Sequence, residues 1–212
     1  FFHPFVVDDI LIKPTWEQVP AESVELTCIQ IDPGTAFGTG AHETTQLCIR
    51  ALNRYMKLMQ AAGLKSIRVL DVGTGSGILG IAAKKLGAAE IFATDLDDNA
   101  LEAVAENLAS NDLNPEDFTV VCGNLIDDPA VQAAAGEACY DIALANILAP
   151  VILMLEKEVW RHLKIGGIFI TSGIIDEKEE EVRAAIAANP HFEVLEVNRQ
   201  GEWSSVVARR KA

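Results

Sequence analysis

The hydrophobic and polar positions change their period along the chain, and from residue 67 onward they predict a regular series of strand and helix pairs. Short runs rich in β-branched residues are typical of strands, whereas apolar residues three or four positions apart are typical of helices. The expected strands are residues 67–72, 90–94, 118–122, 141–145, 167–172, 192–198 and 204–209. The expected helices are residues 77–86, 97–109, a short one near Val131, 150–163 and 176–188. Because strands joined through helices run parallel, the pattern predicts an α/β fold.

The end of the pattern predicts one antiparallel strand in that sheet. The link at residues 199–203 is short enough for a hairpin, so the last strand runs against the one before it. The expected fold is therefore a three-layer sandwich with a seven-stranded, mostly parallel sheet whose last strand is antiparallel.

The chain ahead of residue 67 predicts a smaller unit and a loop. Two strands are expected at residues 5–12 and 24–31, so residues 1–31 are interpreted as N-terminal strands and a linker. Residues 32–212 are expected to form the main domain. It opens with a loop at residues 32–45, D-P-G-T-A-F-G-T-G-A-H-E-T-T, which leads into a helix at 43–59. Loops this rich in glycine and polar side chains are often functional.

Two of the expected helices carry capping signals. Asp97 stands directly before its helix as an expected N-cap, and Asp176 and Glu179 have the spacing of a capping box. The inward face of the first of these helices is expected to hold Leu101, Val104, Ala105 and Leu108.

The most informative segment is residues 69–81, V-L-D-V-G-T-G-S-G-I-L-G-I. An apolar strand reaches an acid, Asp71, and then passes through Gly73, Gly75 and Gly77 into a helix. Glycines let the backbone approach a ligand closely, and a helix start offers unpaired N–H groups. This turn predicts a binding site for a nucleotide-like ligand.

Two classes of ligand compete for the turn. Gly75, Gly77 and Gly80 have the G-x-G-x-x-G spacing of dinucleotide-binding proteins, so a nicotinamide-dependent dehydrogenase is one alternative. The Asp71 carboxylate disfavours it, because a pyrophosphate packed there would bring like charges together. S-adenosylmethionine carries a sulfonium and an ammonium group and no phosphate, so an acid at this position attracts it. The turn therefore favours S-adenosylmethionine, with Asp71, Gly73 and Gly75 as binding residues.

Polar residues at two later strand ends extend the expected site. Asp95 lies 22 positions after Gly73, where a carboxylate can accept both ribose hydroxyls. Asn146 ends the fourth strand in an apolar surround and needs hydrogen-bond partners. Its amide oxygen could accept from a substrate amine while its NH₂ group faces the cofactor; a helix N-cap is the alternative. Residues 123–125 could flank the adenine or form a plain turn.

Composition narrows the choice of partners. The net charge of −14 and the pI of about 4.6 disfavour nucleic acid, which requires a basic surface. The longest apolar stretch, residues 143–155, contains Asn146 and Pro150 and falls short of the roughly 20 residues that a membrane span needs. The four cysteines have no C-x-x-C pair and no histidine at metal spacing, so we expect no metal site. A cytoplasmic protein is expected.

Several motifs together resemble a known enzyme family. D-V-G-T-G-S-G at 71–77 and T-D-L-D at 94–97 resemble the first two motifs of class I S-adenosylmethionine-dependent methyltransferases. The 32–45 loop, A-N-I-L-A at 145–149, S-G-I at 172–174 and G-E-W at 201–203 resemble the bacterial methyltransferases of ribosomal large-subunit protein eleven, the PrmA family. The resemblance covers essentially the whole chain.

The resemblance implies a reaction, a substrate and a set of site residues. The family methylates lysine side chains and the N-terminal amine of its ribosomal protein substrate. Thr45, Gly73, Asp95 and Asn146 would line the cofactor, and residues 37–40, which include Phe37 and Thr39, would fold over it. Family members also carry a small N-terminal domain that recognises the substrate, and this chain is expected to begin within or after the linker that follows it.

Methyl transfer to nitrogen needs a neutral amine, whereas a lysine amine has an unperturbed pKa of about 10.4. A dry pocket favours the neutral form, and Phe37, Ile147 and Leu148 suit such a pocket. We expect Asn146 to orient the amine and Thr45 to place either the amine or the methionine end of the cofactor. His42 is a possible base. The alternatives are a methyltransferase for another protein or a small-molecule amine, and an inactive S-adenosylmethionine-binding fragment.

Overall fold

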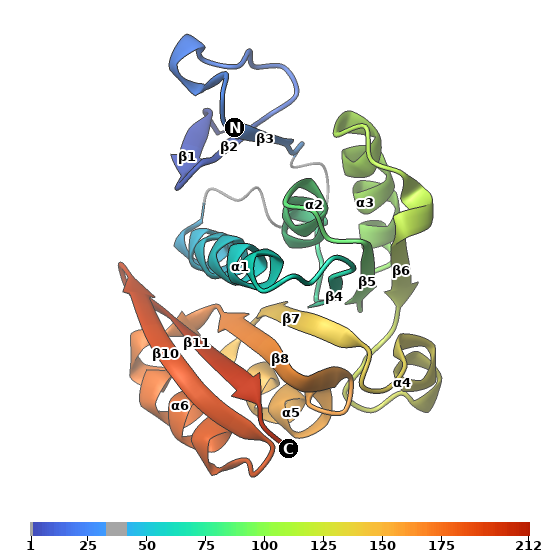
Figure 1. Cartoon of the computed structure of the whole chain (residues 1–212), viewed down its shortest axis with the longest axis vertical. Helices are drawn as coiled ribbons and strands as arrows, with labels where there is room; N and C mark the ends of the chain where they lie inside the picture. Colours follow the sequence, from blue (N-terminus) through green and yellow to red (C-terminus); the bar gives the residue numbers. More distant parts are fainter. Residues whose placement is uncertain (1, 33–41) are drawn as a thin grey trace.

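The computed structural model describes residues 2–32 and 42–212, and within them the chain folds into a three-layer α/β sandwich with a small separate sheet at its N-terminal end (Figure 1). The strands are β1 (Phe5–Val7), β2 (Ile10–Lys13), β3 (Thr27–Gln30), β4 (Arg68–Val72), β5 (Glu90–Asp95), β6 (Phe118–Cys122), β7 (Tyr140–Asn146), β8 (Leu163–Ser172), β9 (Ile174–Ile175), β10 (Phe192–Gln200) and β11 (Trp203–Arg210). The helices are α1 (Glu43–Ala61), α2 (Ile78–Lys85), α3 (Asn99–Ser110), α4 (Pro129–Ala135), α5 (Ala149–Val159) and α6 (Glu179–Ala188).

The main sheet confirms the predicted fold class. Seven strands follow the order β10-β11-β8-β7-β4-β5-β6, and the two-residue strand β9 pairs with β11 beside them. The strands from β8 to β6 along this path are parallel, and β11 runs antiparallel to both β8 and β10. The last strand is thus the antiparallel one, as the short link before it predicts. The sequence pattern did not predict β9.

Each face of the sheet is covered by three helices, because the central strands are apolar on both sides. Val69 and Ile142 pack with α1, α2 and α3, whereas Leu70 and Ala143 pack with α4, α5 and α6. Figure 1 shows α1 and α2 on one side of the sheet and α5 and α6 on the other. Such two-sided burial is typical of parallel sheets.

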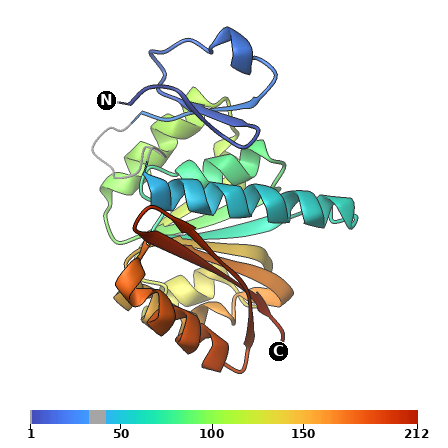
Figure 2. The same ribbon diagram turned by 90° about the vertical axis from the view of Figure 1, so that its left-hand side faces the viewer.

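The small N-terminal sheet corrects the prediction of two strands at residues 5–12 and 24–31. The first of these runs is a tight hairpin, β1 and β2, which reverses at Asp8 with a φ of 51°. The second run follows a 3₁₀ turn at Ala21–Ser23, and within it only β3 is a strand, which pairs with β2 in parallel. Two adjacent acids in an apolar run favour a turn over a continuous strand. Figure 2 shows this sheet above α1. Its buried residues Val7, Ile10, Ile12 and Ile29 belong to the same apolar cluster as those of α1 and α2.

Helix α3 begins two residues later than predicted and turns a different face inward. The N-cap residue is Asp98, not the predicted Asp97, and the Asp98 side chain makes no capping bond. Oδ1 of Asp97 still accepts from the Asn99 N–H at 2.9 Å. Leu101 and Ala105, however, are exposed, and Ala100 and Ala103 are buried in their place. Val104 and Leu108 are buried as expected.

Two other helix predictions were wrong at their ends. Helix α5 stops at Val159, and Leu163, predicted as its last residue, begins β8 instead. The predicted capping box at α6 does not form. The Asp176 N–H donates to the Glu202 carbonyl at 3.0 Å, and the Glu179 carboxylate binds side chains of the β10–β11 hairpin.

The fold brings the predicted site residues to one edge of the sheet. The strand order reverses between β4 and β7, which are neighbours although two strands separate them along the chain. Ligands of open α/β sheets bind outside the carboxyl ends of the strands at such a point. Gly73 follows β4 there and Asn146 ends β7. In residues 2–32 and 42–212, no helix is both long enough and apolar enough to cross a membrane.

Candidate functional site

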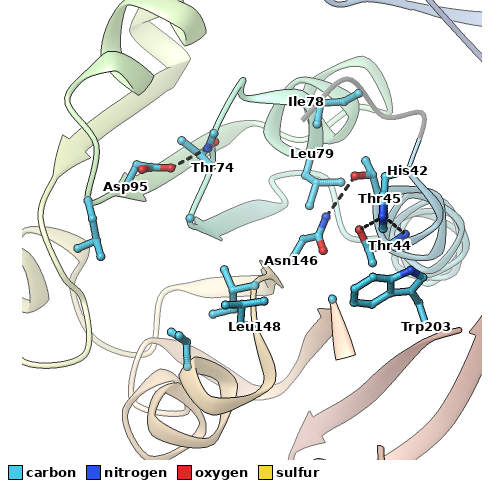
Figure 3. Close-up of a pocket in the computed structure, with 16 residues that line it drawn as sticks. His42, Thr44, Thr45, Thr74, Ile78, Leu79, Asp95, Asn146, Leu148 and Trp203 are labelled. Carbon is cyan, nitrogen blue, oxygen red and sulfur yellow. Dashed lines mark hydrogen bonds between the residues drawn. The ribbon is translucent and has the colours of Figure 1, made fainter. Parts of the chain in front are cut away.

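A cavity of about 500 Å³ lies at the carboxyl ends of β4, β5 and β7, beside the start of α1 (Figure 3). Its described lining comes from six separate parts of the chain. The described lining residues are His42, Thr44, Thr45, Gly73, Thr74, Gly75, Ile78, Leu79, Asp95, Leu96, Asn146, Ile147, Leu148, Val151, Gly173 and Trp203. The cavity therefore contains five of the eight predicted site residues: Thr45, Gly73, Gly75, Asp95 and Asn146.

The glycine turn forms one wall of this cavity. Its backbone is fixed by the Thr94 carbonyl, which accepts from the N–H groups of Gly73 at 2.8 Å and Thr74 at 3.0 Å. Gly73 has a φ of +74°, and a Cβ atom there would lie 2.9 Å from Cγ2 of Ile147. Only glycine therefore leaves room between the turn and the segment after β7.

Asp71 lies behind the turn rather than on the cavity wall. Its side chain is 1% exposed, and Oδ2 accepts from the Thr74 hydroxyl at 2.7 Å. Oδ1 is buried without a hydrogen-bond partner in the described part of the chain. Burial raises the pKa of Asp71 to about 6. Contrary to the prediction that it binds the ligand, the Asp71 carboxylate contacts the turn and is not among the residues that line the cavity.

The raised pKa of Asp71 predicts a pH-dependent stability. The folded protein holds this proton up to about pH 6, whereas the unfolded chain releases it near 3.8, so stability falls as the pH rises between these values. Asp71→Asn removes that titration. The stability of the variant relative to the unsubstituted chain should rise by up to about 3 kcal/mol between pH 4 and pH 7. Urea unfolding at several pH values measures this difference, and a difference that does not change with pH would contradict it.

Asp95 supplies the only acidic side chain of the described lining. Its Oδ2 accepts from the Gly75 N–H at 2.8 Å and its Oδ1 from the Asp97 N–H at 2.9 Å. Each carboxylate oxygen can accept a further hydrogen bond, so both remain available to hydroxyl groups of a ligand. The described lining contains no lysine or arginine. A ligand with phosphate groups would therefore meet a negative charge and no positive one, which disfavours the dehydrogenase alternative.

Asn146 and Thr45 meet in the centre of the cavity. The Nδ2 atom of Asn146, at the end of β7, donates to the Thr45 hydroxyl in the first turn of α1 at 3.2 Å. This contact orients the Asn146 amide. Leu148 is 67% exposed at the cavity, next to the less exposed Ile147. Figure 3 shows Asn146 between Asp95 on one side and His42 and Trp203 on the other.

His42 and Trp203 form the end of the cavity opposite Asp95. Their rings meet edge to face, with centroids 5.2 Å apart. Nδ1 of His42 accepts from the Thr44 N–H at 3.3 Å as the N-cap of α1. The same nitrogen lies 3.0 Å from the Thr44 hydroxyl, so both contacts of Nδ1 hold the ring at the start of the helix. Trp203 reaches the cavity from β11, and only the G-E-W resemblance pointed to its segment.

Three further sequence predictions remain. Phe37 and Thr39 lie outside the described residues. Residues 123–125, considered as adenine neighbours, are not among the residues that line the cavity. In the part of the chain that the structure describes, no group of three or more His, Cys, Asp or Glu side chains could hold a metal ion.

Comparisons with known proteins agree on one family. The family model described as ribosomal protein L11 methyltransferase (PrmA) matches residues 1–211. Ribosomal protein L11 methyltransferases of Lachnospira eligens and Agathobacter rectalis are 48% and 49% identical over 211 and 210 residues. These matches cover 100% and 99% of this chain but only 64% of each relative, so the chain spans less than two thirds of their length. The crystal structure of a ribosomal protein L11 methylase from Lactobacillus delbrueckii subsp. bulgaricus matches with a TM-score of 0.83 and 35% identity, over 100% of both chains.

Proposed function

The chain belongs to the ribosomal protein L11 methyltransferase (PrmA) family, and on this premise we propose that it transfers methyl groups from S-adenosylmethionine to amines of ribosomal protein L11. The amines are lysine side chains, the N-terminal amine, or both. The observation that carries the proposal is the cavity itself: a glycine turn and a carboxylate at one end, an oriented amide in the centre, and no lysine or arginine in its described lining. A cytoplasmic location follows from the proposed substrate.

The residues of the cavity fit S-adenosylmethionine. Gly73 leaves space that a Cβ atom would close, and Asp95 offers carboxylate oxygens for the ribose hydroxyls. Thr45 lies opposite these groups, in the first turn of α1. Asp71 adds negative charge behind the turn when it is ionised, which favours a ligand with cationic groups. Together these residues would bind the cofactor with its sulfonium near Asn146.

The chain's own residues would prepare the acceptor amine. When bound, S-adenosylmethionine supplies a methyl group: the nitrogen lone pair forms the N–C bond, the C–S electron pair passes to sulfur, and the nitrogen loses its proton to water. The apolar side chains of Ile147, Leu148 and Val151 disfavour the charged form of the amine. The Asn146 amide, which Thr45 holds in place, would accept a hydrogen bond from the amine and align its lone pair.

Two measurements test the proposal. Calorimetry should detect binding of S-adenosylmethionine and none of NAD at the same concentration. Incubation with S-adenosylmethionine and purified ribosomal protein L11 should then raise the mass of L11 by whole multiples of one methyl group. Mass spectrometry of L11 peptides should locate the added methyl groups on lysines or on the N-terminus. Binding of NAD in preference to S-adenosylmethionine would restore the dehydrogenase alternative. Cofactor binding without any mass change in L11 would contradict the proposed acceptor.

A further inference from the structure

The part of the β10–β11 hairpin that carries Trp203 has little regular sheet pairing to the body of the molecule. The ladder between β11 and β8 covers only Val207–Arg209, and β9 adds two residue pairs, at Trp203 and Ser204. Figure 1 shows the hairpin at the outer edge of the sheet. Beyond these pairs and the backbone hydrogen bond from Asp176 to Glu202, its orientation, and with it that of Trp203, depends on side-chain contacts.

One side chain, Glu179 in the first turn of α6, makes three of these contacts. Its two carboxylate oxygens accept from Nε and Nη2 of Arg199, both at 2.6 Å, in a bidentate pair. Oε1 also accepts from the Ser204 hydroxyl at 2.7 Å. Arg199 and Ser204 are cross-strand partners in the hairpin. Glu179 thus binds both strands at the same position.

The neighbouring cross-strand pair, Gln200 and Trp203, makes its contacts with α1. Nε2 of Gln200 donates to Oε1 of Gln46 at 2.8 Å, and Gln200 also accepts from Arg50. Successive residues of a strand point to opposite faces. The contact of Ser204 with α6 therefore fixes the strand from one side, while Trp203 faces the cavity and His42 from the other.

We infer that Glu179 is a positioning residue for the acceptor end of the cavity: by binding Arg199 and Ser204 it fixes the hairpin and so sets the place of the Trp203 ring. This rests on the proposed function, since an acceptor amine would enter at the end of the cavity that Trp203 and His42 form. Glu179 touches neither the cavity nor a reacting atom. Glu179 affects binding of the acceptor to the cavity through the position of the Trp203 ring.

The environment of Glu179 supports this role over that of an ordinary surface ion pair. Its side chain is 17% exposed, although Arg199 is 65% exposed. Bidentate pairs with charge-assisted hydrogen bonds are stronger and more directional than most exposed pairs, and the buried Ser204 adds a third bond. The same contacts hold the pKa of Glu179 below its usual value, with the hydrogen bonds from Arg199 as the main cause.

The adjacent residue provides a matched control. Glu180 precedes Arg183 by three positions and binds it from the same helical turn, with Oε1 2.6 Å from Nη2. Its side chain is 75% exposed and, among the described residues, forms its ion pair with Arg183 rather than with the hairpin. Glu180→Ala therefore removes the same charge at the same helix end as Glu179→Ala does, without touching the hairpin.

The position of the Trp203 ring can be measured without any activity. The chain contains three tryptophans, so 5-fluorotryptophan labelling should give three ¹⁹F resonances, and Trp203→Phe identifies one of them. Glu179→Ala should shift or broaden the Trp203 resonance and leave those of Trp16 and Trp160 in place, whereas Glu180→Ala should change none. Glu179→Gln, which keeps an acceptor for Ser204, should show a smaller change and replaces the alanine variant if that variant does not fold. An unchanged Trp203 resonance in the folded Glu179 variants would overturn the inference.

Steady-state kinetics with ribosomal protein L11 test the consequence for the acceptor. Glu179→Ala should raise KM for L11 about fivefold or more, which corresponds to losing about 1 kcal/mol, with Kd for S-adenosylmethionine unchanged within twofold. Glu180→Ala should change neither. Equal KM values for L11 in the two variants would contradict the positioning role. Failure of the unsubstituted chain to methylate L11 would instead refute the proposed function, and the ¹⁹F resonances would still decide whether Glu179 sets the Trp203 ring.

Discussion

Replacing Asn146 by alanine should lower kcat for methylation of ribosomal protein L11 by about two to three orders of magnitude, while Kd for S-adenosylmethionine rises only a few-fold. Asn146 ends β7 in the centre of the cavity, and its amide is oriented by the 3.2 Å hydrogen bond to Thr45. An acceptor amine held by the amide oxygen is aligned for in-line attack, and alanine leaves it free to rotate. The contacts proposed for the cofactor with the glycine turn and Asp95 would remain. Single-turnover methylation and calorimetry measure the two quantities separately.

Thr45 provides the control for this prediction, because its hydroxyl can be kept or removed with little change in volume. Thr45→Ser retains an acceptor for the Asn146 NH₂ group, so kcat should stay within a few-fold of the unsubstituted value. Thr45→Val removes that acceptor and leaves the partly buried NH₂ group of Asn146 without this partner, so kcat should fall further. An Asn146→Ala variant with unchanged kcat would refute the role of Asn146 in orienting the amine.

The sequence predicts the site best where its signal is local. The glycine turn, Asp95 and Asn146 each follow directly from one strand end, and the parallel order of the strands brings all strand ends to one edge. Gly73, Gly75, Asp95 and Asn146 accordingly lie around one cavity. Their residue types and their positions at strand ends are enough to predict that they lie at this edge of the sheet.

Asp71 shows what a strand signal cannot provide. Helices cover both faces of β4, so its residues are buried on either side and no alternation of polar and apolar positions marks which face points to the ligand. The sequence therefore places Asp71 at the glycine turn but does not indicate which face of β4 carries its side chain. Its contact with Thr74 became evident only from the path of the backbone through the turn.

Trp203 and His42 show a second limit, which concerns contacts between distant segments. Trp203 reaches His42 only because the β10–β11 hairpin has a defined register and approaches the start of α1. No local pattern specifies that register or the contact of Glu179 with Arg199 and Ser204. The spacing of Asp176 and Glu179 even favoured a capping box, because sequence spacing alone does not reveal a partner on another strand.

Replacing Gly173 by alanine should destabilise the fold more than any other single change considered for this cavity. Gly173 lies between β8 and β9 with a φ of +86°, and a Cβ atom there would lie 2.5 Å from the backbone oxygen of Ile147 and 3.2 Å from Oδ1 of Asn146. A backbone atom cannot rotate away as a side chain can, so the segment after β7 must move. The expected cost is about 1–2 kcal/mol for the left-handed conformation and about 1–3 kcal/mol more for the clash. Movement of Asn146 by about 1 Å would also lower kcat on the order of 100-fold.

Gly166 separates these two costs, because it shares the backbone conformation of Gly173 but not its surroundings. Its φ is +88°, and no atom lies within 4 Å of the position that a Cβ would take. Gly166→Ala should therefore be destabilised only by the left-handed conformation, with kcat unchanged. Gly173→Ala should be destabilised by both the conformation and the clash, and should lose most of its activity. Urea unfolding at pH 7 gives the two stabilities, and methylation of ribosomal protein L11 gives the two rates. Equal losses of stability in the two variants would mean that the segment after β7 can move at no cost. The close approach of Gly173 to Ile147 would then not be what holds Asn146 in the cavity.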